Sequence, residues 1–253
     1  MQVTFLGTGT SGGVPMISCP CAVCKSTDTK DKRLRTSVLI ETEELTLCVD
    51  AGPDFRQQML REEVKNIDAL LITHGHRDHI GGLDDIRPFN FFQHKIIPLY
   101  CNQESEAMIR EQYAYAFKKS DYDFAPKVEF QTIRHDNFQI KNLTITPIEV
   151  MHHSLPVTAF RIHDFTYITD GKTISDTEKE KIKGTKTLVI NALRKEEHHS
   201  HFTLAQALQL IEEINPEQAY LIHMSHQFGL HEEMQKELPA NVKIAYDGLK
   251  ISV

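Results

Sequence analysis

The sequence predicts an α/β fold of the layered α+β kind, and three observations support this. The 253 residues suffice for one large domain with a sizeable core. Short apolar segments rich in β-branched residues alternate with longer amphipathic segments. Many strands with interspersed helices are typical of layered folds that contain much antiparallel sheet. Since no low-complexity stretch, linker or repeat divides the chain, we expect residues 1–253 to form a single domain.

The apolar segments define the expected strands and helices in order. The strands are predicted at Val3–Leu6, Ser37–Glu41, Leu45–Val49, Ala69–Thr73, Ile97–Cys101, Val128–Thr132, Leu143–Val150, Thr158–Ile162, Thr166–Thr169, Thr187–Ile190, Ala219–Ile222 and Lys243–Ala245. The helices are predicted at Asp54–Glu63, Gln103–Phe117, Asp176–Lys183, Thr203–Ile214 and His231–Glu237. Thr203 is suited to cap the fourth helix, and Pro216 follows its end.

The charge balance argues against a polyanionic partner. Lys and Arg total 28 and Asp and Glu total 35, which gives a net charge of −7. An acidic surface disfavours broad capture of long nucleic acid or of an anionic membrane. No apolar run approaches the roughly 18 residues of a membrane span, and the first residues lack a basic segment followed by a long apolar one. We therefore expect a cytoplasmic protein with no membrane or long nucleic-acid partner.

The histidines are unevenly distributed. Of the 14 in the chain, most lie in four clusters: His74, His76 and His79; His152 and His153; His198, His199 and His201; His223, His226 and His231. Such grouping points to metal binding or acid–base chemistry.

Several of these clusters directly follow predicted strands. His74, His152, Asp170 and His223 each come after a separate strand. Strands that deliver side chains into loops at one sheet edge commonly build sites in α/β proteins. We expect these side chains to converge.

The segment His74-Gly75-His76-Arg77-Asp78-His79 is the strongest motif. Its four donor side chains within six residues cannot all face one way on a regular element. A tight loop would splay them over two adjacent metals, with His74 and His76 on one and Asp78 and His79 on the other. Gly75 and the pair Gly81-Gly82 would supply the backbone freedom for such a turn. The alternative is a solvated polar loop.

This motif resembles the signature of the metallo-β-lactamase-fold hydrolases, His-x-His-x-Asp-His after a strand. The opening Phe5–Thr10 and the strand that ends in Asp50 are similar to the first segments of that superfamily. The resemblance covers nearly the whole chain and implies an αββα sandwich, in which two mixed sheets flanked by helices hold a dinuclear metal site.

The resemblance also assigns the remaining ligands by position. His153 would complete the first metal's histidines, His223 would complete the second metal, and Asp170 would bridge both. His152 competes with His153 for this position. The His-Ser pattern of the family favours His153. Asp170 precedes a glycine and could be a plain turn residue. His223 could be a strand-end histidine without a metal.

Three cysteines form a second candidate metal site. Cys19, Cys21 and Cys24 lie in one short loop and need one more ligand for tetrahedral zinc. His226 lies three residues after His223. On an extended strand end this spacing points the two rings in different directions, so His226 can serve a different site from His223. A structural zinc with a Cys₃His ligand set follows; the alternative is a group of reduced surface thiols. This loop, paired with His223-x-x-His226, resembles the phosphoribosyl 1,2-cyclic phosphate phosphodiesterase branch.

In that branch, a histidine upstream of the helix at Thr203 acts near the leaving group. By resemblance this is His199 or His201, and the sequence does not separate them; an exposed histidine-rich loop is the alternative. The resemblance also implies a homodimer.

These residues predict a metal-dependent phosphodiesterase for a small, cyclic phosphodiester. Two divalent ions about 3.5–4 Å apart would hold a bridging hydroxide that attacks phosphorus. The metals would be zinc, manganese or iron, because His and Asp ligands accept all three. Asp78 and Asp170 would hold the metals, and His199 or His201 would protonate the departing oxygen.

Three other functions compete with this one. A tRNA 3′-processing nuclease would need a basic arm, which the segment Leu83–Pro88 does not provide. A thiolester or lactone hydrolase could use the same metals. A redox protein that does not hydrolyse would be expected to carry a partner electron-transfer domain.

Overall fold

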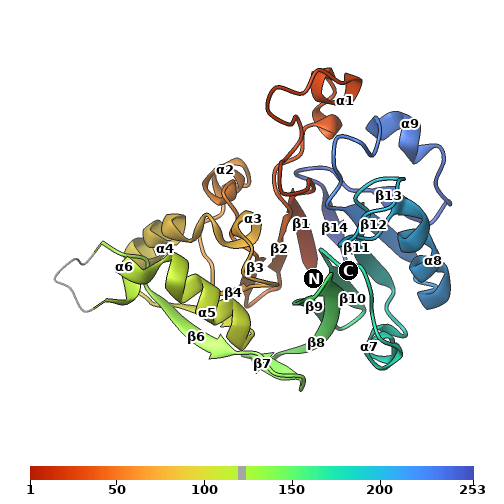
Figure 1. The fold of residues 1–253 in the computed structure, drawn as a ribbon. Coiled ribbons are helices and arrows are strands. Elements are labelled where there is room, and N and C mark those ends of the chain that lie inside the picture. Colours follow the sequence, from red (N-terminus) through yellow and green to blue (C-terminus); the bar gives the residue numbers. More distant parts are fainter. Residues whose placement is uncertain (119–123) are drawn as a thin grey trace.

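The protein folds as two mixed β-sheets that pack face to face, with helices on both outer faces (Figure 1). This computed structural model describes residues 1–118 and 124–253. The layers follow the order helices, sheet, sheet, helices. The predicted αββα architecture is confirmed.

The first sheet has the order β14-β1-β2-β3-β4-β5-β6. Its strands are β1 (Gln2–Gly7), β2 (Ser37–Glu41), β3 (Thr46–Val49), β4 (Ala69–Leu71), β5 (Ile97–Cys101), β6 (Val128–Thr132) and β14 (Lys250–Ser252). Pairing is antiparallel from β14 to β3 and parallel from β3 to β6. Its helices are α2 (Phe55–Arg61), α3 (Arg77–Ile80), α4 (Arg87–Gln93), α5 (Gln103–Gln112) and α6 (Ala114–Phe117).

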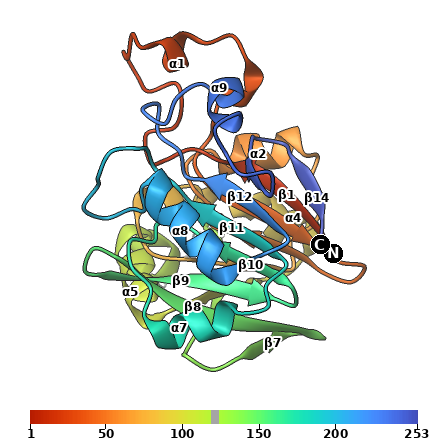
Figure 2. The same ribbon diagram turned by 90° about the vertical axis from the view of Figure 1, so that its right-hand side faces the viewer.

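The second sheet has the order β13-β12-β11-β10-β9-β8-β7. Its strands are β7 (Phe138–Ile140), β8 (Leu143–His152), β9 (Leu155–Ile162), β10 (Phe165–Ile168), β11 (Thr187–Asn191), β12 (Gln218–Ile222) and β13 (Val242–Ile244). Pairing is parallel from β13 to β10 and antiparallel from β10 to β7. Figure 2 shows α7 (Asp176–Ile182) and α8 (Leu204–Ile214) in front of this sheet, with α9 (His231–Gln235) above them near α1 (Ala22–Lys25).

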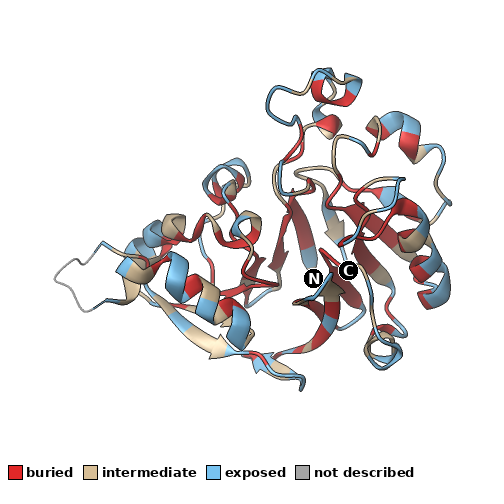
Figure 3. Ribbon diagram, in the orientation of Figure 1, coloured by how far each residue is buried: buried red, intermediate tan, exposed pale blue. Residues whose placement is uncertain are grey.

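The apolar core lies in three layers, and the sheets carry most of the buried residues (Figure 3). Between the sheets, Phe5, Phe160 and Tyr167 are almost entirely shielded from solvent. Truncating a buried phenylalanine to alanine costs about 3–5 kcal/mol, so this layer stabilises the frame that carries the strand ends.

Local sequence signals placed most elements correctly. Thr203 caps α8 as predicted and forms a capping box with Gln206. The predicted helix over Gln103–Phe117 breaks at Tyr113 into α5 and α6. Strands β7 and β14 were not predicted, because each has only three residues and depends on pairing with a neighbouring strand. Within the described ranges, no helix is long and apolar enough to cross a membrane.

Candidate metal centre and cysteine cluster

The candidate centre lies where parallel strands of both sheets end. Asp50 follows β3 and His74 comes shortly after β4, whereas Asp170 and His223 follow β10 and β12 of the other sheet. Three of these residues have left-handed backbones, with φ of 64° at Asp50, 55° at Asp170 and 57° at His223. Non-glycine residues seldom adopt this conformation, and it concentrates at functional sites. Strands β3, β10 and β12 are therefore each followed by a sharp turn that carries a polar side chain.

The His74–His79 motif combines a loop with one helical turn. His74 is buried in the loop, His76 is the N-cap of α3, and Asp78 and His79 lie within α3. The turn does not use the backbone freedom expected of Gly75, Gly81 and Gly82, because none of them has a positive φ. At Gly75, an added Cβ would lie 2.7 Å from the Met108 sulfur. Its small size lets the loop pack against α5.

The donor atoms converge in three overlapping groups. Within each group the atoms lie within 4.8 Å of one another: His74, His79 and Asp170; His152, Asp170 and His201; Asp78, Asp170 and His223. Asp170 belongs to all three groups, which is the central position predicted for it. His76 joins through its Nδ1, which is 3.0 Å from His74 Nε2.

Asp50 fixes the orientation of His79 and was not predicted as a site residue. His79 Nδ1 donates to Asp50 Oδ2 at 2.7 Å, and Thr73 donates to the same carboxylate through its backbone N and its hydroxyl. His79 Nε2 therefore faces the centre. A carboxylate behind a histidine is the usual outer partner of a metal-binding imidazole. A buried aspartate at a strand end was the available sequence signal.

The His79 Nε2 atom tests whether the donor set suits a metal. It is buried and makes no hydrogen bond among the described residues, although Asp170 Oδ2 lies 3.2 Å away and Asp78 Oδ2 lies 3.3 Å away. His223 Nε2 likewise lies 3.2 Å from Asp170 Oδ1. Imidazole nitrogens and carboxylate oxygens that face one point suit a divalent cation.

The pKa shifts in the centre indicate that its carboxylates favour a positive charge near His79. Burial opposes a charged imidazole, but the carboxylates of Asp170, Asp78 and Asp50 outweigh it and raise the pKa of His79 well above its usual value. Burial holds the pKa of His74 well below its usual value, and burial together with His223 lowers the pKa of His201 to about 3. The rings of His74 and His201 are therefore neutral at neutral pH, while the carboxylates around His79 favour a positive charge.

The expectation that His153 faces the centre is wrong, because His152 does so instead. Strand β8 runs to His152, which pairs with Leu155, so that His153 and Ser154 form the two-residue turn of a hairpin. His153 is exposed with φ of 57°, whereas the His152 ring lies 5.2 Å from that of His76 and 4.5 Å from that of His201. The strand was predicted to end at Val150. Since side chains alternate, continuing it by two residues would have placed His152 on the buried face of Val150.

The structure separates His199 from His201. His201 is buried, and its Nε2 lies 3.3 Å from Asp170 Oδ1. His199 is exposed, and its ring lies 5.9 Å from that of His153. Of the two predicted alternatives, only His201 lies at the centre.

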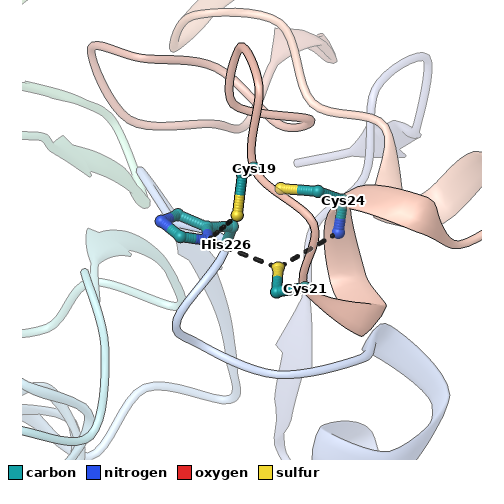
Figure 4. Close-up of side chains that lie close together, drawn as sticks. All are labelled: Cys19, Cys21, Cys24 and His226. Atoms are coloured by element: carbon teal, nitrogen blue, oxygen red, sulfur yellow. Dashed lines mark hydrogen bonds between the residues drawn. The ribbon is translucent and has the colours of Figure 1, made fainter.

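Cys19, Cys21, Cys24 and His226 form the second cluster, with their donor atoms within 4.8 Å of one another (Figure 4). His226 Nδ1 lies 3.3 Å from Cys19 Sγ and 3.4 Å from Cys21 Sγ. All of the cysteines are free thiols. A backbone N–H from Cys24 and the ring of His226 lower the pKa of Cys21 to about 6, while burial raises the pKa of Cys24 to about 11. The predicted four donors are brought together and suit tetrahedral zinc.

The two clusters are connected through the segment 223–226. The N-terminal loop runs beside it, because Thr10 N donates to Met224 O and Met224 N donates to Thr8 O. The hydroxyl of Thr10, which is half-buried, lies 3.3 Å from His223 Nε2. The same segment therefore supplies one donor to each cluster.

Comparisons with known proteins identify the family. Residues 46–224 match the beta-lactamase superfamily domain. The chain is 40% identical over 253 residues to an octanoyltransferase of Porphyromonas gingivalis, covering 99% of this chain and 51% of that protein. It is 34% identical over 109 residues to coenzyme PQQ synthesis protein B of Methylorubrum extorquens, covering 36% of each. The chain thus spans about half or less of these curated relatives.

Two solved structures resemble the whole fold. A diphosphatase from the PhnP family superposes with a TM-score of 0.93 at 37% identity, covering 100% of this chain and 97% of that chain. Zn²⁺-bound PqqB from Methylobacterium extorquens superposes with a TM-score of 0.82 at 20% identity and covers both chains fully. Because the family match extends over most of the chain and includes the His74–His79 motif, this protein belongs to the beta-lactamase superfamily of metal-binding enzymes.

Proposed function

We propose that this chain is a metal-dependent phosphodiesterase that hydrolyses a small, cyclic phosphodiester. The observation that carries the proposal is the position of Asp170, whose carboxylate is shared by all three donor groups. A shared carboxylate is suited to bridge two cations. The similarity to a PhnP-family diphosphatase also supports phosphate chemistry.

We divide the donors of these three groups into two ligand sets around Asp170, with His201 outside both. We assign His74, His76 and His152 to one ion, and Asp78, His79 and His223 to the other, with Asp170 between them. Zinc, manganese and iron all suit these ligands. When bound, two such ions supply Lewis-acid stabilisation of phosphate oxygens and a hydrolytic nucleophile at neutral pH.

The protein's own groups then orient the reaction. Asp50 holds His79 in one orientation, so its Nε2 stays directed at the centre. His201 Nε2 lies beside Asp170 and His223 and can donate a hydrogen bond to the departing oxygen of the substrate. Burial excludes water from the rings of His74, His79 and His223, which strengthens these electrostatic contacts.

We also propose that Cys19, Cys21, Cys24 and His226 hold a structural zinc. A closed set of four protein ligands leaves no open position for a substrate, as in structural sites. The cluster joins the N-terminal loop to the segment after β12 and so stabilises their contact.

A substrate panel on protein of measured metal content tests the phosphodiesterase proposal. The panel contains a ribosyl 1,2-cyclic phosphate, a 2′,3′-cyclic nucleotide, a linear phosphodiester, a diphosphate and an octanoyl thiolester. We expect the highest kcat/KM for a cyclic phosphodiester and loss of that activity in Asp170→Ala. Preference for the thiolester would overturn the proposal, and preference for the diphosphate would replace its substrate class.

The octanoyl thiolester represents a second candidate function. It is favoured by the 40% identity to an octanoyltransferase, although this chain covers only 51% of that protein. Since the rest of that relative could carry the transferase activity, the phosphodiesterase proposal is preferred.

A further inference from the structure

One residue, Ser200, contacts two of the histidines at the centre, His152 and His201. Ser200 is buried between them. Its backbone carbonyl lies 2.9 Å from His152 Nδ1, and its hydroxyl lies 3.0 Å from His201 Nδ1. The rings of His152 and His201 are themselves 4.5 Å apart. Both imidazoles are therefore held from behind by different atoms of the same residue.

The two contacts have different chemical consequences. A carbonyl oxygen can only accept a hydrogen bond, so His152 must carry its proton on Nδ1. In the neutral ring this leaves Nε2 with a free lone pair, which is the form that binds a metal. A hydroxyl can instead donate, which allows His201 Nδ1 to accept and leaves the proton of the neutral ring on Nε2.

The hydroxyl of Ser200 has a second neighbour that must be considered. His198 Nδ1 lies 3.3 Å from Ser200 Oγ, but it also lies 3.4 Å from the Ser200 backbone N–H, which donates to it. His198 Nδ1 therefore already has a donor. The Ser200 hydroxyl can therefore donate its one proton to His201 Nδ1, which is the shorter of the two contacts.

We propose that Ser200 is a positioning residue that gives the two imidazoles different roles. Its carbonyl makes His152 a metal ligand, and its hydroxyl makes His201 a hydrogen-bond donor to the departing oxygen. This inference rests on the proposed phosphodiesterase function for the second role only. The backbone of the loop is held in place, because Phe202 N donates to Gly171 O directly after Asp170.

Removal of the hydroxyl tests the second role without disturbing the first. In Ser200→Ala the carbonyl remains, so the metal content should equal that of the wild type. With a 2′,3′-cyclic nucleotide, whose leaving group is an alkoxide, kcat should fall about 10- to 100-fold with little change in KM. With bis(p-nitrophenyl) phosphate, whose leaving group is already stable, kcat should change by less than about threefold.

Two further variants act as controls. Ser154→Ala removes a hydroxyl that lies 3.2 Å from the Nδ1 of the exposed His153, the same type of contact outside the centre, and should leave both rates unchanged. The double variant Ser200→Ala/His201→Ala should be no slower than His201→Ala, because Ser200 acts through His201. Equal losses on both substrates, loss of metal in Ser200→Ala, or additive effects in the double variant would overturn the proposal.

A spectroscopic measurement separates this inference from the proposed function. In zinc-loaded protein, ¹H–¹⁵N correlations of the imidazoles should show the proton on Nδ1 of His152 and on Nε2 of His201. Ser200→Ala should alter the His201 signals and leave those of His152 unchanged. A proton on Nδ1 of His201 in the wild type contradicts the inference even if the enzyme hydrolyses phosphodiesters. The expected tautomers in a protein inactive on phosphodiesters would instead refute the proposed function.

Discussion

The histidine–aspartate centre and the cysteine cluster bring metal donors together in different ways. The centre takes its donors from the ends of strands in both sheets, and most of them are buried. The cysteine cluster takes three donors from residues 19–24 and only His226 from elsewhere, and three of its four residues are half-exposed. A rigid double sheet can assemble the first site without a metal, whereas the short loop of the second has little core of its own. We infer that metal stabilises the cysteine loop but mainly activates the centre.

Replacing the shared carboxylate should have the largest effect on activity. Asp170→Ala removes the carboxylate shared by the three donor groups of the centre and should lower kcat/KM by more than about 1000-fold, with loss of active-site metal. Elemental analysis and hydrolysis of a cyclic phosphodiester measure both effects. One metal ion per chain should remain, held by the cysteines. Full activity would refute the assignment of Asp170.

The paired variants His152→Ala and His153→Ala sharpen the description of the centre. His152→Ala should lower kcat/KM by about 100-fold or more, because it removes a proposed ligand. His153→Ala changes an exposed turn residue and should stay within about twofold. Steady-state kinetics with metal analysis compares the two, and the reverse order of effects would contradict the hairpin geometry.

Asp50→Asn tests the hydrogen bond between His79 Nδ1 and the Asp50 carboxylate. The amide keeps the shape but removes the charge that receives the His79 Nδ1 proton at 2.7 Å. We expect metal affinity to fall about 10- to 100-fold, as for other outer-shell partners of metal-binding histidines. Competition with a chromophoric chelator measures it. An unchanged affinity would show that the sheet alone orients the ring.

Cys19→Ser should change activity least and stability most clearly. The variant should lose one metal ion per chain, become sensitive to proteolysis within residues 11–32, and melt about 5 °C lower. The activity of the folded protein should stay within about threefold. Cys101→Ala, which changes a buried thiol outside the cluster, should keep every metal ion. Loss of the active-site metals in Cys19→Ser would show that the shared segment 223–226 couples the two sites.

The sequence by itself determined the family, most of the strands and the donors that lie next to one another in the chain. The spacing within His74–His79 and Cys19–Cys24 is local, so it can be recognised without the fold. The same holds for the cap at Thr203, since a helix N-cap involves only neighbouring residues.

Only the tertiary structure decided between neighbouring candidates. The choice of His152 over His153 depends on where β8 ends, and that is fixed by its pairing with β9. The choice of His201 over His199 depends on how the loop after β11 lies beside Asp170. The roles of Asp50 and Ser200 come from contacts with residues far away or on another element. In each case the position of the side chain depends on long-range strand pairing and burial. Neighbouring residues in the sequence do not determine these.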